Sequence, residues 1–204
     1  DLTRSIQVEA SGEVAELKDN INTMIRNLRG TTEQNTEQDW LKTNIANFTR
    51  MMQGQRDLVT VGQMLLSELA PLVNAQHSVV YRMDAGNGRS CLKMLAGYAH
   101  HGESDVRREF GLGESVVGQC ALEKRSILLT DVPPDYIRIS SGLGETSPSN
   151  IIVLPVLFEG QTKAVIELAS LTRFTQMHLT FLAQLPERID IVLNTLEATM
   201  CPEG

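Results

Sequence analysis

Three cysteines and four histidines are the side chains of this sequence that most often act as nucleophiles or metal ligands. Cys91, Cys120 and Cys201 lie far apart, and none belongs to a Cys-x-x-Cys pair. An odd number of scattered cysteines is a poor disulfide framework, so buried thiols in a reducing compartment are expected. His100 and His101 are adjacent, and on a strand they would point to opposite faces, so they cannot hold one metal ion together. Neither residue type predicts a catalytic or metal centre.

Gly111, Gly113 and Gly118 come nearest to the spacing of a phosphate-binding loop. The spacing departs from Gly-x-Gly-x-x-Gly, and only a short strand could precede it, so we interpret these residues as turn glycines. The net charge of -7 argues against the clustered basic surface that nucleic acids require. The sequence therefore predicts no catalytic residue, no metal, no cofactor and no nucleic-acid partner.

The elements that must position any site fall into two parts, which meet near Arg56. In the first part, apolar residues recur at steps of three and four, which is the spacing of a coiled-coil seam. The residues are Val14, Leu17, Ile21, Met24 and Leu28, followed by Leu41, Ile45, Phe48 and Met52. An isolated helix cannot bury one thin apolar stripe, so we predict a homodimer through parallel helices. Phe48→Glu is then expected to weaken the dimer and to leave the rest of the chain folded.

The two apolar runs are out of register with each other. Leu28 and Leu41 are thirteen residues apart, whereas unbroken heptads would place equivalent positions ten or fourteen apart. The polar segment 30–39 lies between them and contains Gly30, which weakens a helix. We predict a continuous helix with a phase shift in this segment. A break in the helix is the alternative.

After Arg56 the pattern is that of an α+β domain. Helices are predicted at 58–73, at 115–123 with Ser115 as N-cap, and after Thr175 with a kink at Pro186. Strands are predicted at 78–83, 91–98, 126–129, 151–158 and 163–168, while 133–148 is expected to be loop with at most a turn of helix. Pro155 within a strand indicates an edge or a bulge. The last helix repeats the seam spacing at Leu182, Leu185, Ile189, Val192 and Leu196.

Several motifs of this second part occur in a fixed order. They are the run from Leu112 to Gly118, the apolar segment 127–132 with Asp131, Leu154-Pro155-Val156, and 164–168 followed by Phe174-Thr175. In this order they resemble the GAF family of small-molecule sensory domains, over residues 56–199. The resemblance implies an antiparallel sheet flanked by helices, here preceded by a long coiled-coil helix.

The resemblance also implies a pocket between the sheet and the helix that begins at Ser115. By family position, the candidate lining residues are Tyr98, Arg107, Val117, Cys120, Ile139 and Asn150. A supporting role in the core or the loops is the alternative for each. Cys120 lacks the following histidine that is common where relatives attach bilin, and the signature of the cyclic-nucleotide branch is absent. An unknown small-molecule ligand stays open.

The start of the chain resembles the end of a HAMP domain. Leu2 and Ile6 occupy the places of two tucked apolar residues in a connector, and Gly12-Glu13 opens the following helix. Together the resemblances imply the relay region of a bacterial sensor histidine kinase in a two-component phosphorelay. The domains would be a HAMP-like end at 1–29, a signalling linker at 30–56, and a GAF-like domain with an output helix at 57–200.

This resemblance implies that the fragment itself is not an enzyme. Its histidines lack the His-Glu context of a phospho-accepting residue, so the kinase core belongs downstream in a parent chain whose partner is a response regulator. The first hypothesis is a conformational relay, and the alternative is a sensor in which a bound metabolite sets the kinase state. A sulfoxide-reductase type of GAF enzyme would need closely placed reactive cysteines. No run of about twenty apolar residues is present, so a cytoplasmic location is expected, with a parent that a membrane segment could anchor.

Overall fold

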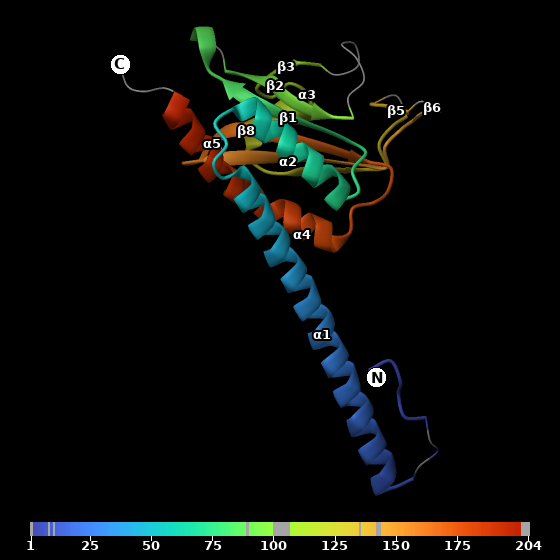
Figure 1. Cartoon of the computed structure of the whole chain (residues 1–204). Helices are drawn as coiled ribbons and strands as arrows, with labels where there is room; N and C mark the ends of the chain where they lie inside the picture. Colours follow the sequence, from blue (N-terminus) through green and yellow to red (C-terminus); the bar gives the residue numbers. More distant parts are fainter. Residues whose placement is uncertain are drawn as a thin grey trace. The chain divides into compact units, whose positions relative to one another are not determined.

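The computed structural model describes residues 2–7, 9, 11–88, 90–99, 107–134, 136–141 and 144–200 (Figure 1). The chain divides into two compact units, Asp1–Asn44 and Ile45–Gly204. The first unit contains an extended N-terminal segment and most of helix α1. The second contains the end of α1 and a sheet with its helices. No helix among the described residues is long and apolar enough to cross a membrane.

Helix α1 runs from Glu13 to Met52 without interruption. The prediction that the helix continues through the polar segment 30–39 is therefore confirmed. Within and beside this segment, the hydroxyls of Thr31, Thr32 and Thr36 each donate a hydrogen bond of 2.9 Å to the carbonyl oxygen four residues earlier. Such bonds compete mildly with the helical ladder and favour bending.

Six strands form an antiparallel sheet in the order β3-β2-β1-β8-β7-β4. The strands are β1 His77–Asp84, β2 Cys91–Tyr98, β3 Glu109–Gly111, β4 Ile127–Thr130, β7 Asn150–Phe158 and β8 Gln161–Ser170. Each of the five predicted strands lies within one or two residues of an observed one. The α+β class and the GAF-like sheet that the resemblance implied are confirmed.

Strand β8 lies at the centre of this sheet, and helices cover both of its faces. On one face, Ala164 and Ile166 lie with residues of α2 (Leu58–Leu72) and α5 (Pro186–Met200). On the other face, Val165 packs in one apolar cluster with residues of α3 (Ser115–Glu123). Figure 1 shows α2 and α3 on opposite sides of the sheet. A side chain in the middle of β8 therefore points toward helices on either face of the sheet.

Pro155 lies where strand β7 has lost its outer neighbour. Strand β4 pairs with β7 only from Asn150 to Val153, while β7 and β8 continue to pair as far as Phe158. Proline is tolerated at such a local edge because no ladder partner needs its missing N–H. The pairing also shifts between Val156 and Leu157. The prediction of an edge or bulge at Pro155 is confirmed.

The segment 133–148 differs from the sequence prediction. A small hairpin forms there, with β5 at Ile139–Ser141 paired to β6 at Gly144–Thr146. The proline, glycine and serine residues of this segment predicted a loop. Strands of three residues are too short to show an alternation of apolar and polar residues in the sequence. Gly86–Gly88 forms a short 3-10 turn between β1 and β2.

The prediction that Ser115 caps helix α3 is wrong. The N-cap is Glu114, which makes no side-chain cap bond, and Ser115 is the first helical residue with a φ of 61°. The Glu114 carboxylate instead accepts a hydrogen bond of 2.9 Å from the N–H of Gly111 and one of 2.5 Å from Arg107. Glu114 thus holds together the loop that precedes α3. The sequence alone does not distinguish this role from the capping of a helix.

Gly118 of α3 lies against the backbone of the same loop. Its carbonyl oxygen accepts a hydrogen bond of 2.9 Å from the N–H of Gly113, and a Cβ atom at Gly118 would lie 2.2 Å from the carbonyl oxygen of Gly111. The helix and the loop therefore touch backbone to backbone, which only glycine permits.

We expect Gly118→Ala to lower the free energy of unfolding of the second unit by about 3 kcal/mol, because a backbone clash cannot be relieved by changing a rotamer. Denaturant titration measures this change. Gly30→Ala is the matched control, since a Cβ there meets nothing within 4 Å and alanine favours a helix interior by up to about 1 kcal/mol. An unchanged unfolding midpoint for Gly118→Ala would contradict the close approach.

The C-terminal helix is kinked at Pro186, as predicted. Helix α4 spans Gln176–Gln184 and α5 begins at Pro186, while Leu185 between them keeps helical dihedral angles of -60° and -44°. Thr175 is the N-cap of α4, and its hydroxyl accepts a hydrogen bond of 3.2 Å from the N–H of His178. The predicted cap at Thr175 is therefore confirmed.

Five residues assigned to the dimer seam are buried within the second unit of a single chain. They are Phe48, Met52, Leu182, Leu185 and Ile189. The Phe48 and Phe181 ring centroids are 5.6 Å apart, so the last turns of α1 pack directly on α4. For these five positions the seam assignment is wrong, because a spacing of three and four describes any helix with one buried face.

The seam residues of the first unit have a different environment. Val14, Leu17, Met24 and Leu28 are more than half exposed, at 62%, 58%, 59% and 54%. Ile21 and Leu41 of this unit are partly buried, as are Ile45 and Val192 of the second unit, while the side chain of Leu196 lies outside the described residues. The exposed stripe between Val14 and Leu28 is the part of the seam that a partner helix would still cover.

Candidate functional site

The face of the sheet under α3 carries an apolar cluster with one acidic side chain in its midst. Along β8, Val165 and Ala169 belong to this cluster, and Glu167 lies between them on the same face. Its neighbours across the sheet are Val79 on β1 and Val153 on β7. The buried members of the cluster are Val79, Tyr81, Leu92, Phe110, Val117, Cys120, Ala121, Val132, Ile151, Val153, Val165 and Ala169.

Glu167 is a partly exposed acidic side chain on the face of the sheet that α3 covers. Protein atoms surround the carboxyl group closely enough that burial raises its pKa from 4.5 to about 7. Part of the side-chain surface nevertheless stays accessible. At neutral pH the protonated and the ionised forms of the group are therefore both present.

The charge of Glu167 acts on two tyrosines. Burial raises the pKa of Tyr136, a hydrogen bond from Ser115 acts in the opposite direction, and the charge of Glu167 raises it further. Burial, with added repulsion from Glu167, also raises the pKa of Tyr81, whose hydroxyl lies 3.5 Å from the carbonyl oxygen of Arg107. Glu167 is thus near enough to both phenols to influence their ionisation.

The cysteines of this region are not activated. Cys120 is fully buried, and burial, followed by the charges of Glu123 and Glu167, raises its pKa to about 12. Cys91 is partly exposed, and a hydrogen bond with Glu109 raises its pKa. Both thiols are protonated at neutral pH and are weak nucleophiles. The described residues include no group of three or more His, Cys, Asp or Glu that could hold a metal ion.

Three of the six predicted pocket residues lie at this cluster. Val117 and Cys120 are buried members contributed by α3, and Ile139 of β5 packs against the cluster. The Arg107 guanidinium lies 5.1 Å from the centroid of the Phe110 ring and 2.5 Å from the Glu114 carboxylate. Tyr98 ends β2 opposite Ser78 and is partly buried.

Asn150 has a structural environment. Its amide nitrogen donates hydrogen bonds to the carbonyl oxygens of Ser149 and Leu129, at 2.9 and 3.4 Å, and its oxygen accepts one of 3.1 Å from the N–H of Phe174. The side chain is 2% exposed. It joins the backbone of β4, the start of β7 and the entry to α4, so its polar atoms are engaged with the fold. This favours the supporting role over the pocket role.

Sequence reasoning missed Glu167, although the sequence contains a signal for it. Glu167 interrupts an apolar run, Ala164-Val165-Ile166 before it and Leu168-Ala169 after it. A charged residue inside such a run is unusual for a central strand, which is normally apolar on both faces. The signal becomes clear only when β8 is known to be central.

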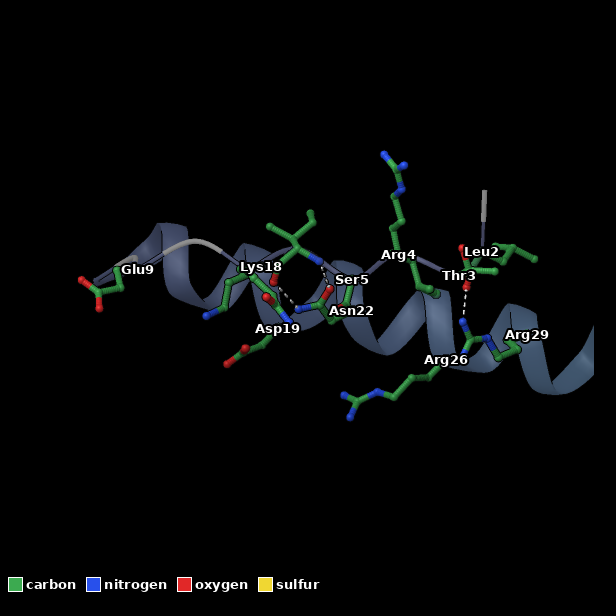
Figure 2. A pocket seen from close by; sticks show the side chains of 13 residues that line it. Leu2, Thr3, Arg4, Ser5, Glu9, Lys18, Asp19, Asn22, Arg26 and Arg29 are labelled. Carbon is green, nitrogen blue, oxygen red and sulfur yellow. Dashed lines mark hydrogen bonds between the residues drawn. The ribbon is translucent and has the colours of Figure 1, made fainter.

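A second groove lies in the first unit, where residues 2–7 run antiparallel to α1. The N–H of Ile6 donates a hydrogen bond of 2.9 Å to the side-chain oxygen of Asn22, whose amide donates one of 3.2 Å back to the Ile6 carbonyl oxygen. The Arg29 guanidinium donates to the carbonyl oxygen of Leu2 at 2.7 Å. Figure 2 shows these side chains bridging from α1 to the connector.

This connector groove is open and of mixed charge, with a volume of about 960 Å³. Lys18, Asp19 and Arg26 line it from the helix. Leu2 and Ile6, which were expected to be tucked, remain 37% and 38% exposed because a single helix lies beside them. The groove is open to solvent, whereas Val117, Cys120 and Ile139 of the predicted pocket meet at the apolar cluster under α3, so this cluster is the better candidate site.

Comparisons with known proteins agree with this geometry. The sequence profile of the GAF domain matches residues 55–194. No curated protein was found to match the chain. Among solved structures, the GAF domain of a phosphoenolpyruvate-protein phosphotransferase from Coxiella burnetii is similar at a TM-score of 0.64 and 15% identity, over 78% of this chain and 96% of that one.

Two further structures show the range of proteins that share the fold. A free methionine-R-sulfoxide reductase from Neisseria meningitidis, in complex with its substrate, is similar at a TM-score of 0.61 and 17% identity, over 76% of this chain and 89% of that one. Residues 122 to 287 of a methyl-accepting chemotaxis protein are similar at a TM-score of 0.56 and 14% identity. The match covers 76% of this chain and 99% of that one. At these identities the likeness concerns the fold alone.

Proposed function

Because this chain belongs to the GAF domain family, a family of sensory and signalling domains, we propose that it is the signal-relay region of a two-component sensor histidine kinase. Helix α1 would receive a conformational change from an upstream HAMP domain and pass it to the GAF domain. The terminal helix α5 would pass it on to a kinase core in the same parent chain, which acts on a response regulator.

The observation that carries this proposal is the continuity of α1. The helix is unbroken from Glu13 to Met52, and its last turns, with Phe48 and Met52, are part of the core of the second unit. A rotation or bend of the helix would therefore act directly on that core. Interfaces and packed cores respond to such displacements by switching between discrete arrangements.

The connector supports an upstream HAMP domain. Residues 2–7 return along α1 and are fixed to it through Asn22 and Arg29, in the order that a connector leading into a second HAMP helix requires. The exposed stripe from Val14 to Leu28 supports assembly as a parallel homodimer, since it leaves four large apolar side chains in water.

The linker segment 30–39 tests the relay. Deleting seven residues within 31–38 of the full-length parent keeps the phase of the helix, so a stimulated change in kinase activity is expected to persist. Deleting four residues turns the following helix by roughly half a heptad, and output is expected to become locked or inverted. The measurement is phosphate transfer by the parent with and without its stimulus.

A normal response from the four-residue deletion would show that helical phase is not what α1 transmits. The same proposal requires a phospho-accepting histidine motif after Met200 in the parent gene. A parent that lacks this motif would overturn the kinase assignment and leave the GAF assignment intact.

The face of the sheet under α3 favours a second function, in which the GAF domain senses a small molecule. Val117, Cys120 and Ile139 of the predicted pocket lie at the apolar cluster there, and burial raises the pKa of Glu167 on the same face. The protonated thiols of Cys91 and Cys120 favour a binding site over a reductase site. Bound ligand would stabilise the second unit and so bias the state that α1 and α5 adopt.

A further inference from the structure

Helix α4 begins with a capping box in which a histidine supplies the second acceptor. The Thr175 hydroxyl accepts a hydrogen bond of 3.2 Å from the N–H of His178, and the Nδ1 atom of His178 accepts one of 3.5 Å from the N–H of Thr175. A glutamate or glutamine usually supplies this second acceptor, and its oxygen accepts throughout the neutral pH range. In α4 the acceptor is a ring nitrogen that itself binds a proton near neutral pH.

Protonation of His178 acts against the capping box in two ways. Only the neutral ring, with its proton on Nε2, leaves a lone pair on Nδ1 for the N–H of Thr175. The imidazolium ion has a proton on both nitrogens and cannot accept this bond. Its positive charge would also lie in the first turn of α4, where the helix dipole disfavours a cation. A proton on His178 therefore removes one half of the capping box.

The surroundings of His178 oppose its protonation. Burial lowers the pKa of His178 below 6.5, and no charge among the described residues contributes to this shift. Helix α4 carries no other titratable side chain. The charged side chains in the loop before α4 and on the elements that pack on it are Arg173, which pairs with Asp131, Arg50 at the end of α1, and Glu187, Arg188 and Asp190 on α5.

The capping box lies one turn before the contact between α4 and α1. Phe181 follows His178 by three residues, is fully buried, and packs on Phe48 with ring centroids 5.6 Å apart. Helix α4 has nine residues, which is about two and a half turns. A helix this short depends on its caps and on its packing, because few hydrogen bonds offset the cost of starting it. Fraying at the capping box therefore reaches the turn on which α1 packs.

We propose that His178 is a pH-sensitive capping residue that controls the packing of the last turns of α1 on α4. In its neutral form the ring closes the capping box and holds Phe181 against Phe48. In its protonated form the ring releases the first turn of α4 and loosens this contact. The inference goes beyond the relay proposed above, because the coupling lies within the second unit and is measured without a parent chain.

The direction of the pH dependence follows from the lowered pKa. The folded domain binds a proton at His178 more weakly than the unfolded chain does. The stabilisation that His178 gives is therefore complete above pH 6.5 and is lost as the pH falls through the lower pKa of the folded state. Glu167, with a pKa of about 7, titrates in the same range, but its contribution is identical in variants that differ only at His178.

The test uses the whole chain, labelled with ¹⁵N, between pH 8 and pH 5. The nitrogen shifts of the imidazole ring report the pKa of His178 and the position of its neutral proton. Hydrogen exchange, corrected for the pH dependence of the chemical step, reports the protection of two amides. They are Leu179, which donates a hydrogen bond of 3.0 Å to the Thr175 carbonyl oxygen, and Met52 in the last turn of α1.

Three variants separate the cap from the titration. His178→Gln keeps an acceptor that does not titrate, and His178→Ala removes the acceptor. His77→Gln is the matched control, since His77 begins β1 and lies outside α4. Comparing the four proteins at each pH removes the contribution of every other titrating group.

His178 is expected to titrate below pH 6.5 and to carry its neutral proton on Nε2. Between pH 8 and pH 5 the protection of both amides is expected to fall about fivefold in the wild type and in His77→Gln, which is the usual size of a helix-cap contribution. His178→Gln is expected to stay protected at both pH values. His178→Ala is expected to have the low protection at both.

A neutral ring with its proton on Nδ1 would overturn the capping role of His178. Constant protection in the wild type, or an equal fall in His178→Gln, would overturn its pH sensitivity. Protection that falls at Leu179 and stays constant at Met52 would overturn the coupling to α1. Each of these outcomes leaves the relay to be decided by the deletions in segment 30–39, so the two proposals are tested separately.

Discussion

Replacing Phe48 by alanine is expected to lower the free energy of unfolding of the second unit by roughly 4 kcal/mol. Phe48 is 5% exposed and packs on Phe181, which is fully buried, at a centroid distance of 5.6 Å. The substitution removes a ring from a filled core and leaves a cavity that the neighbouring helices can close only in part. Denaturant titration followed by far-ultraviolet circular dichroism measures the change.

Met24→Glu is the control for this experiment, because Met24 is 59% exposed in the first unit. It is expected to leave the unfolding of the second unit unchanged and to shift light scattering toward a monomer, since a charge enters the proposed dimer stripe. If Phe48→Ala lost dimerisation but kept wild-type stability, Phe48 would be a seam residue and its packing on α4 would be incorrect.

The second large effect concerns pH. At pH 8, Glu167→Gln is expected to be more stable than the wild type by about 3 kcal/mol, with the difference vanishing near pH 4. The pKa of Glu167 is about 7 in the folded domain and near 4.5 in the unfolded chain. The folded state therefore binds the proton more tightly, and wild-type stability falls as pH rises from 4.5 to 7.

Subtracting the two stability curves isolates this group, because all other titrating residues are shared by the two proteins. Glu68→Gln, exposed on α2, is expected to follow the wild type at every pH. Parallel curves for the wild type and Glu167→Gln would show that the carboxyl group ionises in the folded domain as readily as in the unfolded chain, and would contradict the raised pKa.

Much of the fold was predictable from local pattern. Three of the predicted features depend on residues that are near one another in sequence. They are the uninterrupted helix through Gly30, the strands on either side of Glu159-Gly160 and the cap at Thr175. The short hairpin of β5 and β6 was not predictable, because three-residue strands are held by their context and not by their own alternation.

The candidate site was less predictable, for two physical reasons. A spacing of three and four shows that Phe48 has a buried side but not whether a partner chain or the same chain covers it. For Glu167, alternation gives the face of the strand, but enclosure depends on β8 lying between β1 and β7, and this order involves residues distant in sequence. Asn150 likewise reveals its role only through bonds to Leu129 and Phe174.

The two borders of the six-stranded sheet are unusually brief, with three residues in β3 and four in β4. Strands from other molecules add to open sheet borders, and this is a common start of aggregation. A border of three or four residues offers few free backbone groups for such growth, and Pro155 removes a donor from the part of β7 that β4 leaves uncovered. A dimer formed through the long helices would bring two sheets close together. Because their edge strands are so short, the two sheets would still not join edge to edge.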